Sequence, residues 1–167
     1  MKSLSFVLLL LPLQEAPRPD PAAVETCLTK VRAIHGTPGP WAVAGYRLGQ
    51  RALKELNLPA GSVMLVANHF APARVQFSCM VDGVQAATGA SLGKLNLKLT
   101  EAPVGELRTE FTNKKSGVKL IFRLRPEFMA AIRDLPPGEL EAAGRRVASL
   151  PDDEIFVIER AAGPTGP

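Results

Sequence analysis

Residues 78–97, SCMVDGVQAATGASLGKLNL, are the stretch on which the rest of the fold depends. Ser78 is a suitable N-cap, and Cys79 and Asp82 follow it at helical spacing. Gly89 stands where a residue in the left-handed conformation would end the helix. The pattern therefore predicts a helix from Ser78 to Gly89, with the thiol of Cys79 and the carboxylate of Asp82 on one face. A thiol at the N-terminus of a helix would also have a lowered pKa.

The residues that follow this helix form a short polar loop and then a strand. Leu95, Leu97 and Leu99 alternate with polar residues, as in a strand with one buried side. The loop brings Lys94 and Asn96 close to the end of the helix. We therefore expect Gln85, Lys94 and Asn96 to contribute to a ligand site beside the thiol and the carboxylate.

Two helices are predicted upstream. Asp20 and Pro21 mark the start of a helix that runs to about Ile34, and the turn HGTPGPW (35–41) interrupts it directly after His35. A second helix begins at Pro40 and runs to about Leu56. It contains Gly45, whose helix propensity is about 1 kcal/mol worse than that of alanine, so we expect a close neighbour or a ligand there.

The remaining elements are mainly strands. A strand at 61–70 carries His69 near its end, and residues 106–113 and 118–124 are predicted to pair as a hairpin. Two helices follow at 126–135 and 139–150, and residues 152–160 have the pattern of an edge strand. This order predicts an α+β fold in which helices pack on a mixed, largely antiparallel sheet within a single domain.

Composition narrows the class of protein. The chain has 167 residues, 46% of them hydrophobic, which is enough for one core. Its net charge of +4 is mild, the basic residues are dispersed along the sequence, and aromatic residues make up 5%, so we expect no nucleic-acid partner.

The N-terminus predicts export. The apolar run LSFVLLLLPL (4–13) has the length of a signal peptide and is too short to span a bilayer as a helix. We therefore assign 1–19 to a signal peptide and Pro-rich spacer, 20–160 to the domain and 161–167 to a flexible tail. The protein would then be secreted or periplasmic, with no stable membrane insertion after cleavage. The alternative is a buried N-terminal strand or helix.

Several motifs together resemble the family of the E subunit of formylmethanofuran dehydrogenase. They are His35-Gly36, then Gly45-Tyr46-Arg47, then CMVDGVQ (79–85), TG (88–89) and GKLNL (93–97). The segments NKKSG (113–117) and LPDDEIF (150–156) resemble two further motifs of that family. The resemblance spans about His35 to Glu159, and it implies an α+β domain that binds a zinc-like metal and often forms a homodimer.

The sequence departs from the family pattern at three ligand positions. Thr37 replaces a histidine, and Gly39 and Ala90 replace cysteines. His35, Cys79, Asp82, Lys94 and Asn96 occupy matching positions. The family's role in methanogenic carbon dioxide chemistry does not carry over to a motif-depleted, exported chain.

The residues allow three interpretations of the predicted site around Cys79. His35, His69, Cys79 and Asp82 could bind a divalent metal, with zinc expected because it accepts imidazole and thiolate ligands, and Arg47 could face the same pocket. Alternatively, the site is a metal-free remnant in a non-catalytic binding or scaffold domain. The third possibility is a disulfide between Cys27 and Cys79.

Overall fold

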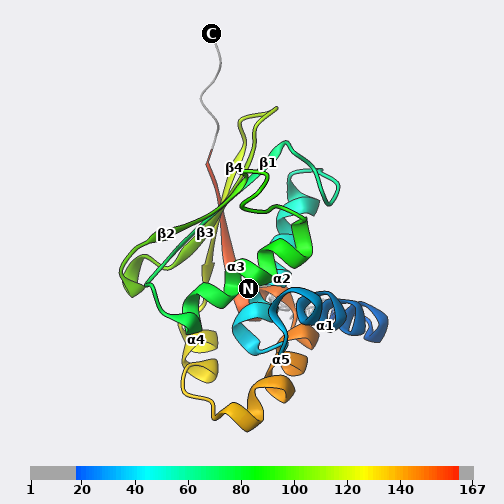
Figure 1. Ribbon diagram of the computed structural model, residues 1–167, viewed down its shortest axis with the longest axis vertical. Helices are drawn as coiled ribbons and strands as arrows, with labels where there is room; N and C mark the ends of the chain where they lie inside the picture. The colour runs from blue at the N-terminus through cyan, green and yellow to red at the C-terminus, as the bar shows by residue number, and fades with distance from the viewer. Residues whose placement is uncertain (1–17, 162–167) are drawn as a thin grey trace, which may run out of the picture.

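The computed structural model describes residues 18–161 (Figure 1). The apolar run of the predicted signal peptide and all but the first residue of the predicted tail lie outside these residues. The helices are α1 (Pro21–His35), α2 (Pro40–Glu55), α3 (Val75–Thr88), α4 (Pro126–Ile132), α5 (Leu140–Ser149) and α6 (Asp152–Ile155), with 3₁₀ turns η1 (Val104–Glu106) and η2 (Pro137–Glu139). The strands are β1 (Leu65–Ala71), β2 (Leu97–Glu101), β3 (Arg108–Asn113), β4 (Lys119–Leu124) and β5 (Phe156–Ala161).

The five strands form one sheet in the order β2-β1-β3-β4-β5. Strands β1 and β2 are parallel and the other pairs are antiparallel. Helix α3 is the crossover between the parallel pair, since parallel neighbours need a long connection. The predicted α+β class, the mixed sheet and the single domain are therefore confirmed.

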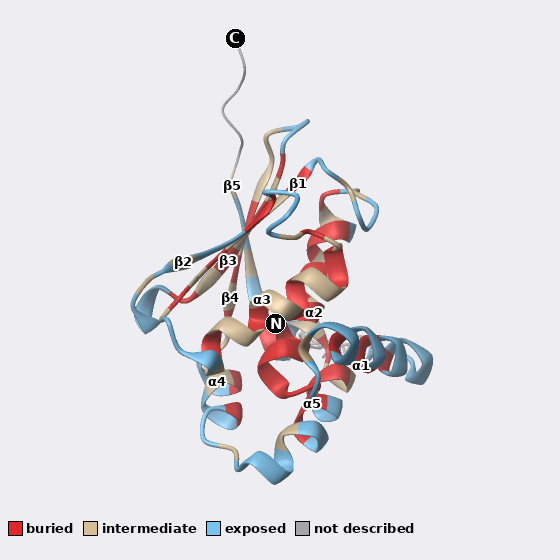
Figure 2. Ribbon diagram, in the orientation of Figure 1, coloured by how far each residue is buried: buried red, intermediate tan, exposed pale blue. Residues whose placement is uncertain are grey.

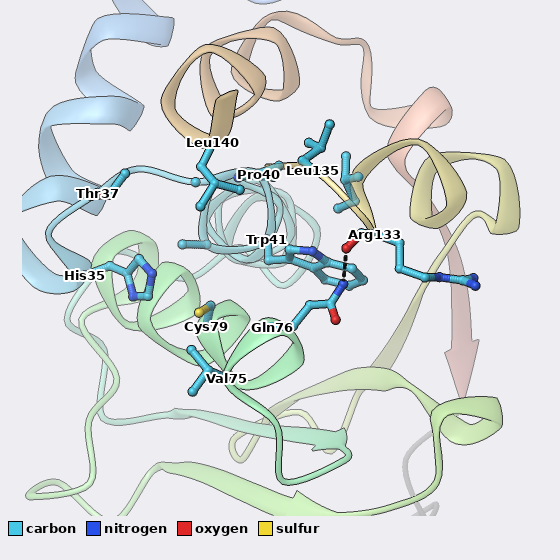
Figure 3. Close-up of a pocket in the computed structure, with 13 residues that line it drawn as sticks. His35, Thr37, Pro40, Trp41, Val75, Gln76, Cys79, Arg133, Leu135 and Leu140 are labelled. Atoms are coloured by element: carbon cyan, nitrogen blue, oxygen red, sulfur yellow. Dashed lines mark hydrogen bonds between the residues drawn. The ribbon is translucent and has the colours of Figure 1, made fainter. Parts of the chain in front are cut away.

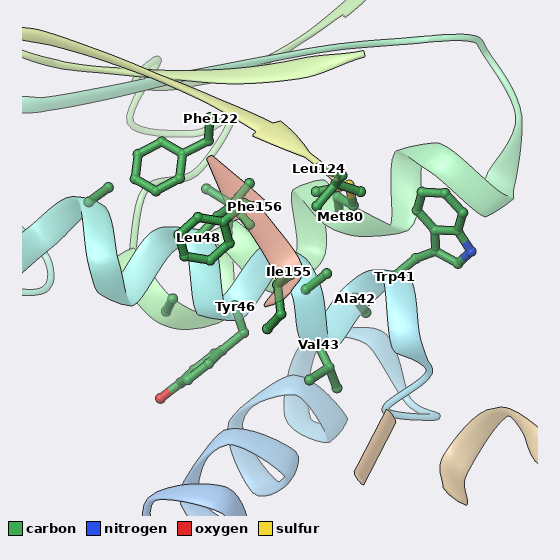
Figure 4. Close-up of a cluster of buried hydrophobic side chains, with 14 of the residues drawn as sticks. Trp41, Ala42, Val43, Tyr46, Leu48, Met80, Phe122, Leu124, Ile155 and Phe156 are labelled. Carbon is green, nitrogen blue, oxygen red and sulfur yellow. The ribbon is translucent and has the colours of Figure 1, made fainter. Parts of the chain in front are cut away.

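The core lies between the sheet and the helix pair α2 and α3. The central strands bury alternate residues, which places one face of the sheet against the helices (Figure 2). Trp41, Leu48, Met80, Phe122 and Phe156 belong to this layer (Figure 4). The rings of Phe122 and Phe156 are 5.2 Å apart in an edge-to-face arrangement, which is favourable for aromatic pairs.

Glycines allow α2 and α3 to approach closely. A Cβ atom on Gly45 would overlap the backbone of Met80, and one on Gly83 would overlap the Ala42 carbonyl. The close neighbour expected at Gly45 is therefore the backbone of α3.

Three local predictions need correction. Helix α3 starts at Val75 after an N-cap at Arg74, so Ser78 lies inside the helix. Strand β1 starts at Leu65, four residues later than predicted. The segment 152–160 does not form a strand throughout. Its first four residues form the short helix α6 after Pro151, and pairing with β4 begins only at Phe156.

The predicted burial in the strand after α3 is also only partly right. Leu97 is buried, but Leu95 is 83% exposed and Leu99 is 46% exposed. Gly89 does end α3 in the left-handed conformation, as predicted. Within residues 18–161, no helix is long and apolar enough to cross a membrane.

Candidate functional site

A pocket lies where the α1–α2 turn, the first half of α3 and the α4–α5 connection meet (Figure 3). Its volume is about 330 Å³, within the range of small-molecule sites. The walls are mainly apolar and come from Trp41, Val75, Ile132, Leu135 and Leu140. Gln76 donates a hydrogen bond of 2.6 Å to the carbonyl of Arg133, which ties α3 to the end of α4 at this pocket.

His35 and Asp82 form a pair beside the pocket. His35 is the last residue of α1, and Asp82 lies on α3; Nδ1 of the ring is 2.8 Å from Oδ2 of the carboxylate. An ionised carboxylate only accepts hydrogen bonds, so Nδ1 carries the proton and donates it. Nε2 has no hydrogen-bond partner among residues 18–161. The imidazole therefore has one nitrogen fixed by Asp82 and the other available to a ligand.

Cys79 lines the same pocket as His35. Partial burial, together with the charge of Asp82, raises the pKa of its thiol. The sequence predicted a helix N-terminus that lowers this pKa, and that prediction is wrong because α3 begins at Val75, which places Cys79 in the second turn of the helix. Cys79 is therefore a protonated thiol near neutral pH, and three of the four predicted metal ligands, His35, Cys79 and Asp82, lie close together.

His69 has a different environment. Its side chain is buried in β1, where Nε2 donates to the Phe77 carbonyl at 3.3 Å and Nδ1 lies 2.9 Å from the Thr109 hydroxyl. Burial lowers its pKa to about 4. Both ring nitrogens are occupied by protein partners, so His69 connects β1, β3 and α3 and does not join the other three residues.

Among residues 18–161, no group of three or more His, Cys, Asp or Glu side chains is arranged to hold a metal ion. Asp82 is hydrogen-bonded to Nδ1 of His35. The atoms that remain to bind a metal at the pocket are Nε2 of His35 and the sulfur of Cys79. Protein zinc sites use at least three protein ligands. The residues present therefore do not complete a zinc site without further ligands.

Arg47 binds inside the protein. Its guanidinium donates to the carboxylate of Asp152 at 2.6 Å and to the carbonyls of Val147 and Ala148 at the end of α5. The carboxylate of Asp152 also accepts a hydrogen bond of 3.3 Å from the guanidinium of Arg51. Arg47 therefore fastens α2 to the C-terminal end of α5 and does not line the pocket with His35.

The other predicted ligand residues surround the end of α3. The Lys94 ammonium donates to the Gly89 carbonyl at 2.8 Å, and the buried Asn96 amide connects the Ser91 N–H to the Leu65 carbonyl. Gln85 lies partly buried on the last turn of α3. The Lys94 and Asn96 side chains therefore stabilise the loop between α3 and β2, and none of the three residues lines the pocket.

The two cysteines are free. Cys27 is buried on α1, near Tyr46 and Arg47, and burial raises the pKa of its thiol to about 12. Cys79 lines the pocket beside His35, and the Cys27–Cys79 disulfide is not formed in this structure.

The apolar wall of the pocket was not predicted from the sequence. Trp41 is the second residue of α2, and its spacing indicates only the apolar stripe of that helix, while Leu135 and Leu140 flank a Pro-Pro-Gly break. Such breaks mark loops, and loops on a rigid scaffold commonly line sites. The break at 136–138 is therefore a sequence signal that could have indicated the wall formed by Leu135 and Leu140.

Comparison with known families and structures gives a consistent result. The profile of the FmdE family, described as molybdenum formylmethanofuran dehydrogenase operon, matches residues 34–157. A crystal structure of a tungsten formylmethanofuran dehydrogenase E-subunit (FmdE)-like protein from Syntrophus aciditrophicus has a similar fold, with a TM-score of 0.52 and 22% identity over 85% of this chain and 73% of that one. Comparison with curated proteins gave no match.

Proposed function

The chain belongs to the FmdE family, and from this premise we propose that it binds a small, largely apolar molecule through one polar group in the pocket lined by His35 and Cys79. The observation that carries the proposal is the 2.8 Å hydrogen bond between His35 and Asp82 beside a mainly apolar cavity.

The His35–Asp82 pair supports a specific kind of polar group. In the neutral form of the ring, the proton lies on Nδ1 towards Asp82, and Nε2 offers a lone pair. A ligand hydroxyl or N–H group would donate to that nitrogen. An apolar molecule without a donor would fill the cavity but leave Nε2 without a partner, which costs affinity.

The apolar body of the ligand would lie against Trp41 and the leucines of the α4–α5 connection. Trp41 is the only tryptophan of the chain, and its ring stands edge-on to Phe77 at 5.1 Å. A flat or cyclic aliphatic group suits such a wall, because aromatic faces and edges give large contact areas at low entropic cost.

Intrinsic fluorescence of Trp41 provides the test. The probes are cyclohexylmethanol and its methyl ether, which differ in the single hydroxyl donor. We expect the alcohol to bind about fivefold more tightly, the value of one net hydrogen bond, and the His35→Ala variant to remove that preference. Equal affinities in the wild-type protein would contradict the role of His35.

A divalent metal is the second candidate. It is supported by the His35–Asp82 bond, because a carboxylate on one ring nitrogen commonly orients an imidazole whose other nitrogen binds metal. His35 and Cys79 would supply two protein ligands, one fewer than zinc sites normally use, so a bound ligand or water would have to complete the coordination. Elemental analysis of the purified protein and of its Cys79→Ala and Cys27→Ala variants tests it. Stoichiometric zinc lost only in Cys79→Ala supports this candidate, and metal-free wild-type protein from zinc-replete cells contradicts it.

Export remains a separate proposal, supported by the apolar run at residues 4–13. Mass spectrometry of the protein recovered from the periplasm or medium tests it. Retention of Met1 in that material would contradict cleavage.

A further inference from the structure

Exposed apolar side chains gather at the end of the molecule away from the pocket. Leu92 and Leu95, in the loop between α3 and β2, are 70% and 83% exposed, and Val63 and Met64, in the loop before β1, are 58% and 37% exposed. Figure 2 shows these loops as exposed segments near the start of β1. Burying such side chains would be favourable, so their exposure on ordered loops needs an explanation.

Hydrogen bonds join these loops to each other and to the β3–β4 turn. The Gly61 N–H donates to the Thr88 carbonyl at 2.7 Å, and the Asn96 amide donates to the Leu65 carbonyl at 3.0 Å. The Lys114 N–H donates to the Met64 carbonyl at 2.9 Å. The three segments therefore form one continuous surface, although they are distant in sequence.

The charge of this surface has one sign. Lys94, Lys114 and Lys115 are exposed there, and the three loops that form it, 57–64, 89–96 and 114–118, contain no Asp or Glu. Glu55, which precedes the first segment, is paired with Arg51 at 2.9 Å and Arg160 at 3.4 Å. We call this surface the basic–apolar tip; it consists of Val63, Met64, Leu92, Leu95 and the three lysines.

Leu95 is held in an uncommon conformation. Its φ is 55°, in the left-handed region that few residues other than glycine and asparagine adopt. Its N–H donates to the Leu92 carbonyl at 2.9 Å, so the turn is fixed before any partner arrives. An exposed leucine at such a position gains nothing for the isolated fold.

We propose that the basic–apolar tip docks on the surface of an anionic lipid bilayer. Lysines close to such a surface are attracted by its negative potential, while leucine side chains insert into the boundary between headgroups and acyl chains. The contact is peripheral and reversible, since four apolar side chains are far short of a membrane-spanning segment.

A second copy of the chain fits this surface poorly. A twofold interface places the same patch on both sides, so the lysines of one tip would face those of the other with no acidic residues to offset them. The charge pattern therefore favours an anionic lipid surface over self-association through the tip.

Flotation of the full-length protein with vesicles tests the proposal. The vesicles contain equal parts of phosphatidylglycerol and phosphatidylcholine, or phosphatidylcholine alone. The Lys114→Ala/Lys115→Ala variant should lower partitioning into anionic vesicles about 30-fold. The control Lys30→Ala/Arg146→Ala makes the same charge change on exposed positions of α1 and α5 and should bind like the wild type.

A second pair of variants tests the leucines. Leu95→Asn removes the apolar side chain, and asparagine tolerates the positive φ, so the fold should keep its stability while binding falls about tenfold. The control Val104→Ser alters a side chain that is 53% exposed at the opposite end of the sheet, and it should leave binding unchanged.

Loss of binding in both tip variants, with binding retained in both controls and absent on neutral vesicles, supports the proposal. Binding shared by all variants, including any due to the apolar residues 4–13, would overturn it. So would equal binding to both vesicle types, or sedimentation showing lipid-free dimers that Leu95→Asn dissociates.

Discussion

Gly83 of α3 lies directly against the backbone of Ala42 in α2, with no room for a Cβ atom between them. Such an approach brings two helix backbones together where a side chain would hold them apart. Because α2 carries Trp41 and α3 carries Cys79, this contact also sets the distance between two walls of the pocket.

Replacing Gly83 by alanine should therefore destabilise the protein by at least about 3 kcal/mol, since the helices must separate and leave gaps in the core. Urea unfolding at neutral pH measures the loss. Gly105→Ala is the matched control, because no atom lies within 4 Å of the position that its Cβ would take. A Gly83→Ala protein as stable as the control would contradict the close approach.

His69 should make stability depend on acid. Burial favours its neutral ring and lowers its pKa to about 4, while in the unfolded chain it titrates near 6.5. The neutral ring's contribution to the free energy of unfolding is complete above about pH 6.5 and is lost as the pH falls towards 4. The lost stability amounts to about 3 kcal/mol. The free energies of unfolding of wild type and His69→Gln should therefore converge on acidification; a difference that stays constant between neutral and mildly acidic pH would contradict this environment.

Both thiols should react slowly in the folded protein. Burial raises the pKa of Cys27 to about 12, and burial with the charge of Asp82 raises the pKa of Cys79. Iodoacetamide at mildly alkaline pH should label Cys79 more slowly than a free thiol and Cys27 more slowly still, because only the thiolate reacts. In denaturant without reductant both thiols should be titratable; finding none would establish the disulfide instead.

Arg47 should matter for stability more than for ligand binding. Removing it leaves Asp152 and two carbonyls at the end of α5 without their main donor, so Arg47→Ala should cost about 2–4 kcal/mol of unfolding free energy. Arg51→Ala, whose side chain is more exposed, should cost less. A normal stability of Arg47→Ala combined with lost probe binding would restore the ligand role predicted from sequence.

The sequence was most informative where local chemistry decides the structure. Asp20 and Pro21 start α1, and Gly89 ends α3 in the left-handed conformation, as their residue types predict. The predicted helix start at Ser78 was wrong because three more residues, beginning at Val75, continue the helix upstream. Local capping preference alone does not decide between two possible starts.

Convergence of distant segments was only partly predictable. The sequence placed His35 and Asp82 in one site as metal ligands, and the structure brings their side chains together in a hydrogen bond. The role of Asn96 did not follow from the sequence, since its partners Ser91 and Leu65 come from two different loops. The same limit applies to the lysines of the tip, which are dispersed in sequence and come together only through the hydrogen bonds between loops.

Nuclear Overhauser contacts between cyclohexylmethanol and the protein would establish whether the pocket binds a ligand as proposed. We predict contacts from the ring of the probe to the Trp41 indole and from its hydroxymethyl group to the side chains of His35 and Cys79. If a saturating concentration of the probe gives no contacts to Trp41, or gives contacts only to residues outside the pocket, the proposed ligand pocket is contradicted.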